Sequence, residues 1–441
     1  MNCDQARTEI IAYLKNELED APKKALEEHL ARCPNCRQEL EGARRLLSWT
    51  EAASQEAVAK KVEGIIDGAI AGAASDIHLE PQRDNELLVR YRIDGVMQEV
   101  ERIDPTQRNG VVTRLKMLAD LSVSETSVPQ DGTINWTRAD KEFYLRISSI
   151  PFVFGESLVL RILDRSSTML GLDKLGFHED DEQRLRDLLG QPNGIILVAG
   201  PTGSGKTTTM YSMLQAVNAP SKKIMTIEDP VEYVIPGVNH GHVNRKAGFT
   251  FASAIRSFMR HDPDVIMVGE VRDMEVALLS LQAALTGHLV IPALPTGDAP
   301  SALIRLVDMG AEPFMISAAV RGVLAQLLVR RVCRDCGEAY QVQASELRRF
   351  GFHPKDPDEL ITLYRGKGCE TCRRTGYRGR TGIYELMTMN DEIADLLVRR
   401  APLTDIREAA KANGMRELRE DGLLKVLEGI TTPDEVMRAL A

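Results

Sequence analysis

Eight consecutive residues near the middle of the chain, Gly200 to Thr207, read GPTGSGKT. They fit the pattern G-x-x-x-x-G-K-[ST], in which glycines let backbone N–H groups wrap an anion. The apolar run IILVA precedes them and a helical pattern follows, which is the context that a phosphate-binding loop requires. We predict a nucleotide site formed by Gly200, Pro201, Thr202, Gly203, Ser204, Gly205, Lys206, Thr207 and Thr208, with Lys206 on the β- and γ-phosphates and Thr207 on Mg²⁺.

Two other apolar runs lead into carboxylates. VIMVGE ends at Glu270, and IMTIEDPVEY contains Glu228, Asp229 and Glu232. A carboxylate at a strand tip beside a phosphate loop can polarise the attacking water or hold a metal-bound water. Acidic clusters before a proline are also typical of solvated turns. Here two acidic strand ends accompany one phosphate-binding loop, and this combination favours a functional role. We predict catalytic roles for Glu270 and Glu228 together with Lys206.

Four of the seven cysteines form one spaced set. Cys333 and Cys336 are separated by two residues, as are Cys369 and Cys372, and 32 residues lie between the pairs. This spacing is typical of a structural Zn²⁺ site with four thiolate ligands. Four unliganded buried thiols are the alternative.

The other three cysteines lie near the N-terminus. Cys3, Cys33 and Cys36 combine with His29 in the pattern C-x25-H-x3-C-x2-C. His29 and Cys33 are four residues apart, so they lie on one face of a helix. We predict a second Zn²⁺ site from these four residues.

The elements that must position these residues fall into successive segments. Residues 1–50 have a helical pattern, and 51–60 predict a helical linker. Residues 61–168 mix strands and helices, including a strand pair turning at "DG" in ELLVRYRIDGVMQEV. From 169 to 441, strands alternate with helices, which indicates an α/β domain; it includes a zinc knuckle at 330–380 and helices at 390–441.

Composition narrows the class of protein. The chain has 441 residues, 43% of them hydrophobic and 27% charged, and its net charge is −9. This charge disfavours nonspecific binding to nucleic acid, so no nucleic-acid partner is expected. Because no apolar run approaches about 20 residues and the first residues lack an apolar signal core, we expect a cytoplasmic protein.

Taken together, the ordered motifs resemble one family. GPTGSGKTTTMY, TIEDPVEY, DPDVIMVGEVRD, AALTGHLV, ASDIHLEP and RYRIDGVM are similar to the secretion ATPases of type II secretion and type IV pilus assembly. The resemblance runs from about residue 60 to the C-terminus. It implies a mixed α/β (PAS-like) amino domain joined to a RecA-like ATPase domain, a six-chain ring, and an inner-membrane platform protein as partner.

The resemblance also assigns residues. It places Glu270 in the second nucleotide motif, the acids at 228, 229 and 232 in an acidic box, and His288 in a histidine box. It implies that Arg92, Arg146 and Arg161 of the amino domain reach the nucleotide, as guanidinium groups suit phosphate oxygens. Exposed surface charges are the alternative for each arginine.

Both zinc sites have counterparts by resemblance. The tetracysteine segment GCETCRRTGYRGRTGIYEL resembles the insertion of the exporting and assembling branches, which makes a retraction motor the weaker hypothesis. The first 50 residues resemble the zinc-binding domain of anti-sigma factors. Such a module would dock a partner not named by the sequence or sense redox state.

One stretch departs from the family pattern. After HLVI the chain reads PALPTGDAP, so by position Pro295 replaces a histidine and Gly297 an asparagine. Because proline cannot hydrogen-bond a γ-phosphate, we predict retained ATP binding with slow or weakly coupled hydrolysis. His288, His240 and His242 are candidates to take over; an exposed strand is the alternative for the last two.

Two function classes remain open beside an assembly motor. The chain is alternatively an ATP-binding regulatory protein whose zinc module docks a sigma-like or other partner. A DNA-translocating relative is a weaker hypothesis, because the tetracysteine insertion and the acidic charge count against it.

Overall fold

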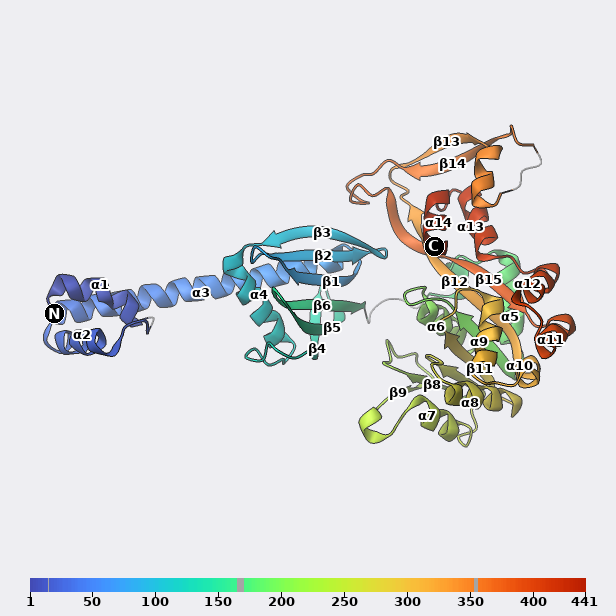
Figure 1. Ribbon diagram of the computed structural model, residues 1–441, viewed down its shortest axis with the longest axis horizontal. Coiled ribbons are helices and arrows are strands. Elements are labelled where there is room, and N and C mark those ends of the chain that lie inside the picture. The colour runs from blue at the N-terminus through green and yellow to red at the C-terminus, as the bar shows by residue number, and fades with distance from the viewer. Residues whose placement is uncertain (15, 165–169, 353–355) are drawn as a thin grey trace. The chain divides into compact units, whose positions relative to one another are not determined.

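The computed structural model describes residues 1–14, 16–164, 170–352 and 356–441. The chain divides into two compact units, Met1–Asp164 and Arg165–Ala441 (Figure 1). The division falls close to the predicted end of the amino domain at residue 168.

The N-terminal helices pack around a small core. They are α1 (Cys3–Leu14), α2 (Asp20–Arg32) and α3 (Pro34–Ala71). Ala6, Leu26, Leu30 and Cys36 are buried between them. Pro34 begins α3, where its missing N–H costs no helical hydrogen bond. The predicted helical linker at 51–60 lies within α3.

The rest of the first unit is an antiparallel sheet with helices on one face. Its strands are β1 (Ala74–Pro81), β2 (Leu87–Ile93), β3 (Val96–Ile103), β4 (Gln130–Arg138), β5 (Lys141–Phe152) and β6 (Gly155–Asp164), in the order β3-β2-β1-β6-β5-β4. Alternate strand residues such as Ile77 and Leu160 pack against α3 and α4 (Pro105–Leu118). The predicted turn at "DG" is confirmed, with positive φ at Asp94 and Gly95.

The second unit contains a seven-stranded sheet. Its strands are β7 (Gly194–Ala199), β8 (Ile224–Glu228), β9 (Val238–His242), β10 (Val265–Val268), β11 (Leu289–Leu294), β12 (Val320–Val332) and β15 (Tyr377–Thr388), in the order β15-β12-β7-β11-β10-β8-β9. All neighbours are parallel except β12 and β15. The apolar runs predicted as buried strands are β7, β10 and β11, and β11 continues through Pro292.

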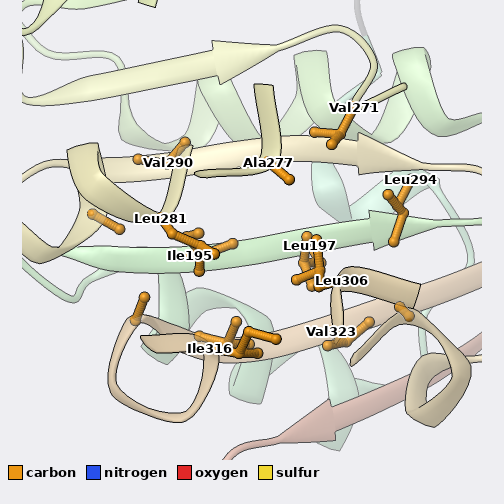
Figure 2. Packing of buried hydrophobic residues seen from close by; sticks show 14 of the residues in the cluster. Ile195, Leu197, Val271, Ala277, Leu281, Val290, Leu294, Leu306, Ile316 and Val323 are labelled. Atoms are coloured by element: carbon orange, nitrogen blue, oxygen red, sulfur yellow. The ribbon is translucent and has the colours of Figure 1, made fainter. Parts of the chain in front are cut away.

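Helices cover both faces of this sheet, as parallel strands require. One face carries α7 (Phe251–Phe258), α8 (Met274–Leu285), α9 (Ala299–Asp308), α10 (Pro313–Ala319), α11 (Asp391–Val398) and α12 (Leu403–Ala412). A short 3-10 helix, η2 (Arg245–Ala247), lies between β9 and α7 in the chain. Figure 2 shows Ala277 and Leu281 of α8 over Ile195 and Leu197 of β7. The other face carries η1 (Leu172–Lys174), α5 (Glu179–Leu189) and α6 (Lys206–Val217).

A smaller core includes Val329 of β12 and Ile383 of β15. It joins the hairpin β13 (Gly337–Gln343) and β14 (Leu360–Gly366) with η3 (Ala344–Phe350), α13 (Leu418–Leu427) and α14 (Pro433–Leu440). The helical pattern predicted for 390–441 is confirmed. Among the described helices, none combines the length and apolar character needed to cross a bilayer.

Candidate functional site

The loop after β7 has the backbone that its sequence predicts. Gly203 and Gly205 have φ of 81° and 88°, in the left-handed region that glycine adopts freely. A Cβ on Gly200 would come within 2.4 Å of the Ser204 Oγ atom. The helix that follows, α6, begins at Lys206 with no capping side chain. Its first N–H groups and the helix dipole therefore favour an anion at this end.

Lys206 lies over this loop. Its Nζ atom donates to the carbonyls of Gly200, at 2.7 Å, and Pro201, at 2.9 Å. Burial lowers the pKa of Lys206, and the negative charge of Glu270 partly opposes that effect. The ammonium group is thus held at the loop by two backbone carbonyls, and the negative charge of Glu270 acts on it. A phosphate that takes the place of the two carbonyls would be a stronger partner.

Strand order brings the carboxylates to the same sheet edge as the loop. β7, β11, β10 and β8 are neighbours, so their carboxyl ends lie side by side. Glu270 follows β10, and its Oε2 atom accepts from Arg272 Nε at 2.6 Å. Gly269 packs so closely on β8 that its N–H donates to the Ile227 carbonyl at 2.9 Å. The predicted grouping of Lys206, Glu270 and Glu228 at one edge follows from this order.

The Glu228 side chain is buried and accepts hydrogen bonds from three neighbouring side chains. It is 3% exposed, and its carboxylate accepts from the Tyr211 hydroxyl, from Thr226 Oγ1 at 2.5 Å and from His240 Nδ1 at 2.8 Å. His240 Nε2 accepts from the Ile235 N–H at 3.0 Å, which fixes Nδ1 as the donor to Glu228. Burial and the nearby carboxylate raise the pKa of Tyr211, so the phenol stays protonated. Sequence reasoning gave Tyr211 no role, although it is the last residue of the quoted motif GPTGSGKTTTMY.

The rest of the acidic box forms a loop beside Glu228. Asp229 is paired with Arg245 at 2.6 Å, and the Glu232 N–H donates to the Tyr211 hydroxyl at 3.4 Å. His242 Nδ1 accepts from the Val231 N–H at 3.4 Å. His240 and His242 belong to neither of the two possible metal clusters found among the described residues.

The tip of β11 lies directly against the phosphate loop. The Leu294 carbonyl accepts from the Gly200 N–H at 3.2 Å and from the Thr296 N–H at 3.1 Å. The second bond closes a three-residue turn with Pro295 at its centre, and proline's fixed φ suits that position. Pro295 is exposed and offers no hydrogen bond donor at a place adjacent to the loop.

We predicted His288 in the nucleotide site, but in the structure it lies far from the phosphate loop of its own chain. His288 precedes β11, and its carbonyl accepts from the N–H of Gly194, the first residue of β7. The phosphate loop follows the opposite end of β7. The six residues of this strand span about 20 Å, which is therefore the approximate distance between His288 and the loop. The His288 Nδ1 atom is satisfied by the Ala283 carbonyl at 2.7 Å.

The three predicted arginines form one row across the first unit's sheet. Arg92 and Arg161 are both register partners of Asp76, and Arg161 is the partner of Arg146. Asp76 is buried and accepts from Arg161 Nε at 2.9 Å, while Arg92 Nε lies 3.7 Å away. The row carries three positive charges and one negative charge on the face opposite the apolar core. It is therefore suited to a polyanion.

The tetracysteine residues converge at the base of the hairpin β13–β14. The Sγ–Sγ distances are 3.9 Å for Cys333 and Cys369, 3.7 Å for Cys336 and Cys372, and 3.7 Å for Cys369 and Cys372. Tetrahedral Zn–S bonds of about 2.3 Å place sulfur atoms about 3.8 Å apart, so this set fits zinc. Burial of the Cys372 thiol would by itself raise its pKa, but hydrogen bonds from the N–H groups of residues 369 and 376 lower the pKa to about 6.

The N-terminal residues also converge as predicted. Cys3, His29, Cys33 and Cys36 each offer one atom, and these atoms lie within 4.8 Å of one another. Cys3 and Cys33 have a sulfur separation of 3.8 Å, and His29 Nε2 lies 3.4 Å from Cys36 Sγ. Both values match the edges of a tetrahedral zinc site with mixed ligands.

Fold and site together define a class. A mostly parallel sheet with helices on both faces, a glycine-wrapped loop after a central strand and a carboxylate after a nearby strand make a RecA-like P-loop ATPase. The family model for Type II/IV secretion system proteins matches residues 51–438, and the chain belongs to that family. A second family model, for a zinc-finger domain, matches residues 3–37.

Characterised relatives agree with this assignment. The chain is 45% identical to the type IV pilus assembly ATPase PilB of Thermus thermophilus over 87% of its own length and 43% of that protein. It is 44% identical to type II secretion system protein E of Xanthomonas campestris over 88% of its length and 68% of that protein. The chain thus spans less than half of the Thermus relative.

Solved structures share the fold. The pilus retraction motor PilT with bound ADP is 26% identical, with a TM-score of 0.57 over 85% of this chain and 96% of that one. The Legionella pneumophila ATPase DotB has a TM-score of 0.63 over 85% of this chain and 94% of its own, at 19% identity, and shows the fold alone.

Proposed function

We propose that this chain binds ATP with Mg²⁺ and hydrolyses it to drive a type II secretion or type IV pilus assembly machine. The observation that carries the proposal is the uncapped N-terminus of α6, wrapped by a glycine loop whose carbonyls hold the Lys206 ammonium group. An assembly role is favoured over retraction by the tetracysteine cluster and by the names of the relatives.

The residues at this edge of the sheet have separate roles in the proposed hydrolysis of ATP. Lys206 leaves the loop carbonyls for the β- and γ-phosphates, and Glu270 orients the attacking water. Mg²⁺, which Thr207 would help to hold, supplies neutralisation of the phosphate charge. The row of Arg92, Arg161 and Arg146 adds positive charge as the γ-phosphoryl group departs, from the same chain or a neighbour. Glu228 positions the acidic box through Tyr211 and His240.

We infer further that six chains form a ring and that an inner-membrane platform protein recruits it to the cytoplasmic face. Zn²⁺ at both cysteine clusters would be structural, because four protein ligands leave no open position. The test is phosphate release by the zinc-loaded full chain with ATP and Mg²⁺, with Lys206→Ala as control. Turnover that Lys206→Ala leaves unchanged would contradict an ATPase built on this loop.

The turn at Pro295 bears on how fast that reaction is. Since a histidine there would place a hydrogen bond donor next to Gly200, we expect Pro295→His to raise the phosphate-release rate about tenfold. ATP affinity should stay within about twofold, because no loop contact is changed. A rate that does not rise would show that Pro295 is not what limits turnover.

A second candidate, an ATP-dependent regulatory protein, is favoured by the zinc-finger match over residues 3–37. In that case the full chain would bind a sigma-like protein in the presence of ATP, and Cys33→Ser would abolish the complex. Binding to a membrane platform protein that Cys33→Ser does not affect would favour the motor.

A further inference from the structure

A buried glutamine on the strand next to β7 touches the phosphate loop. Gln326 lies in β12 and is 1% exposed. Its neighbour Ala325 is the register partner of Ala199, the last residue of β7, so Gln326 lies level with the start of the loop. The Gln326 Nε2 atom donates to the Ser204 carbonyl at 2.7 Å. Neither the nucleotide motifs nor the acidic box contains this residue.

This contact sets the direction of a backbone N–H. The carbonyl of Ser204 and the N–H of Gly205 belong to one planar trans peptide, in which the two groups point in opposite directions. Because Gln326 holds the carbonyl on the β12 side, the Gly205 N–H faces the other side of the loop. We expect an anion bound at the uncapped start of α6 to lie on that side.

The strand β12 also fits closely against both ends of the loop. A Cβ on Gly200 would come within 2.6 Å of the Gln326 carbonyl oxygen, and one on Gly205 within 3.1 Å of Gln326 Nε2. The loop backbone is therefore seated on this residue. A shift of Gln326 would change the orientation of the peptide at Ser204.

Burying the Gln326 side chain at this position costs folding stability. The Gln326 Oε1 and Ser204 Oγ atoms are buried without a hydrogen bond partner. An unsatisfied buried polar atom destabilises a fold, and an apolar side chain of similar size would avoid that penalty. The one hydrogen bond that Gln326 makes to the loop is thus the contact that distinguishes it from leucine.

We propose that Gln326 is a positioning residue for the nucleotide, which acts by fixing the Ser204–Gly205 peptide so that the Gly205 N–H binds the β-phosphate. The inference rests on the proposed function and adds a residue to the same site. It predicts a defect for ligands that carry a β-phosphate and none for AMP.

The test compares Gln326→Leu with the unaltered, zinc-loaded full chain. The dissociation constants of ATP and ADP, with Mg²⁺, should each rise about tenfold, and that of AMP should stay within about twofold. Gln341→Leu, the same change at an exposed position of β13, should alter none of them. Melting of each variant without nucleotide reports whether the fold is kept.

Gln326→Met provides a second variant should Gln326→Leu fail to fold. A thioether keeps the unbranched shape and length of the side chain but cannot donate, so the same loss for ATP and ADP is expected. ADP affinity within about twofold of the unaltered chain, or equal weakening of ADP and AMP, would overturn the inference. If the unaltered chain bound no ATP, the proposed function itself would fail.

Discussion

The Nδ1 atom of His240 lies 2.8 Å from the Oε1 atom of Glu228, and both side chains are about 95% buried. With Thr226 and Tyr211, Glu228 accepts three hydrogen bonds, two at Oε1 and one at Oε2. A carboxylate so occupied is poorly placed to handle a water molecule. Glu270, which is partly exposed and pairs with Arg272, is the better candidate for that task.

Replacing Glu270 should separate binding from hydrolysis. We expect Glu270→Gln to keep ATP affinity within about threefold and to lower the phosphate-release rate at least about 100-fold, because the amide cannot take a proton from water. Glu275→Gln is the matched control and should leave the rate unchanged, because Glu275 is an exposed acid of α8 that pairs with Arg256 of α7. Equal rates for Glu270→Gln and the unaltered chain would assign the reaction to another carboxylate.

Replacing His240 should loosen the acidic box. Without its imidazole, the buried Glu228 carboxylate and the Ile235 N–H each lose a partner, at a cost of about 1–3 kcal/mol. His240→Ala should therefore lower the melting temperature of the second unit by several degrees. The comparison is His242→Ala, which removes an exposed imidazole that accepts a long, 3.4 Å hydrogen bond from the Val231 N–H. If both variants melted alike, the Glu228 contact would contribute nothing to stability.

A buried carboxyl on β15 should make stability depend on pH. Burial raises the pKa of Glu385 to about 7, helped by Asp298 and Glu417 and opposed by N–H groups of Ala299 and Leu418. Since the folded state binds this proton more tightly than the unfolded state, stability falls as pH rises from about 4.5 to 7, by about 3 kcal/mol.

The free energy of unfolding of the second unit, measured by urea denaturation at several pH values, tests this prediction. Glu385→Gln should flatten the fall between about pH 4.5 and 7, because the amide does not titrate. Glu312→Gln, before α10, serves as a control outside this cluster. A fall in stability that persists undiminished in Glu385→Gln would mean that other groups cause it.

The two cysteine clusters should bind metal independently, because they belong to different units. We expect two zinc ions per unaltered chain, one in Cys33→Ser, one in Cys372→Ser and none in the double variant. Atomic absorption of purified protein measures this. ATP affinity should be unchanged in Cys33→Ser, as that cluster lies outside the ATPase unit. Two zinc ions in either single variant would exclude its cluster as a complete site.

Sequence alone predicted the features whose physics is local. The loop at 200–207 carries its own signal, since glycine spacing and flanking apolar residues dictate a strand, a wrapped loop and a helix. Cysteine spacing likewise predicted both clusters, because few folds bring such pairs together without a metal. The strand pair turning at Asp94 and Gly95 was equally readable.

What the sequence could not supply depends on strand order and register. His288 stands in a motif near the loop by resemblance, but register places it at the far end of β11. The burial of Glu228 under Tyr211 and His240 requires β8, β9 and α6 to be packed together, which no periodicity reveals. Gln326 lies 120 residues beyond Lys206, and only the pairing of β12 with β7 brings it to the loop.

The central claim is that a nucleotide's terminal phosphates bind where the glycine loop meets α6. Equilibrium titration of ATP into the zinc-loaded full chain, with and without Mg²⁺, tests it most directly when repeated on Lys206→Ala. The account predicts saturable binding that Mg²⁺ strengthens and that the variant weakens at least about 100-fold. Absence of binding by the unaltered chain, or equal affinity in the variant, would contradict it.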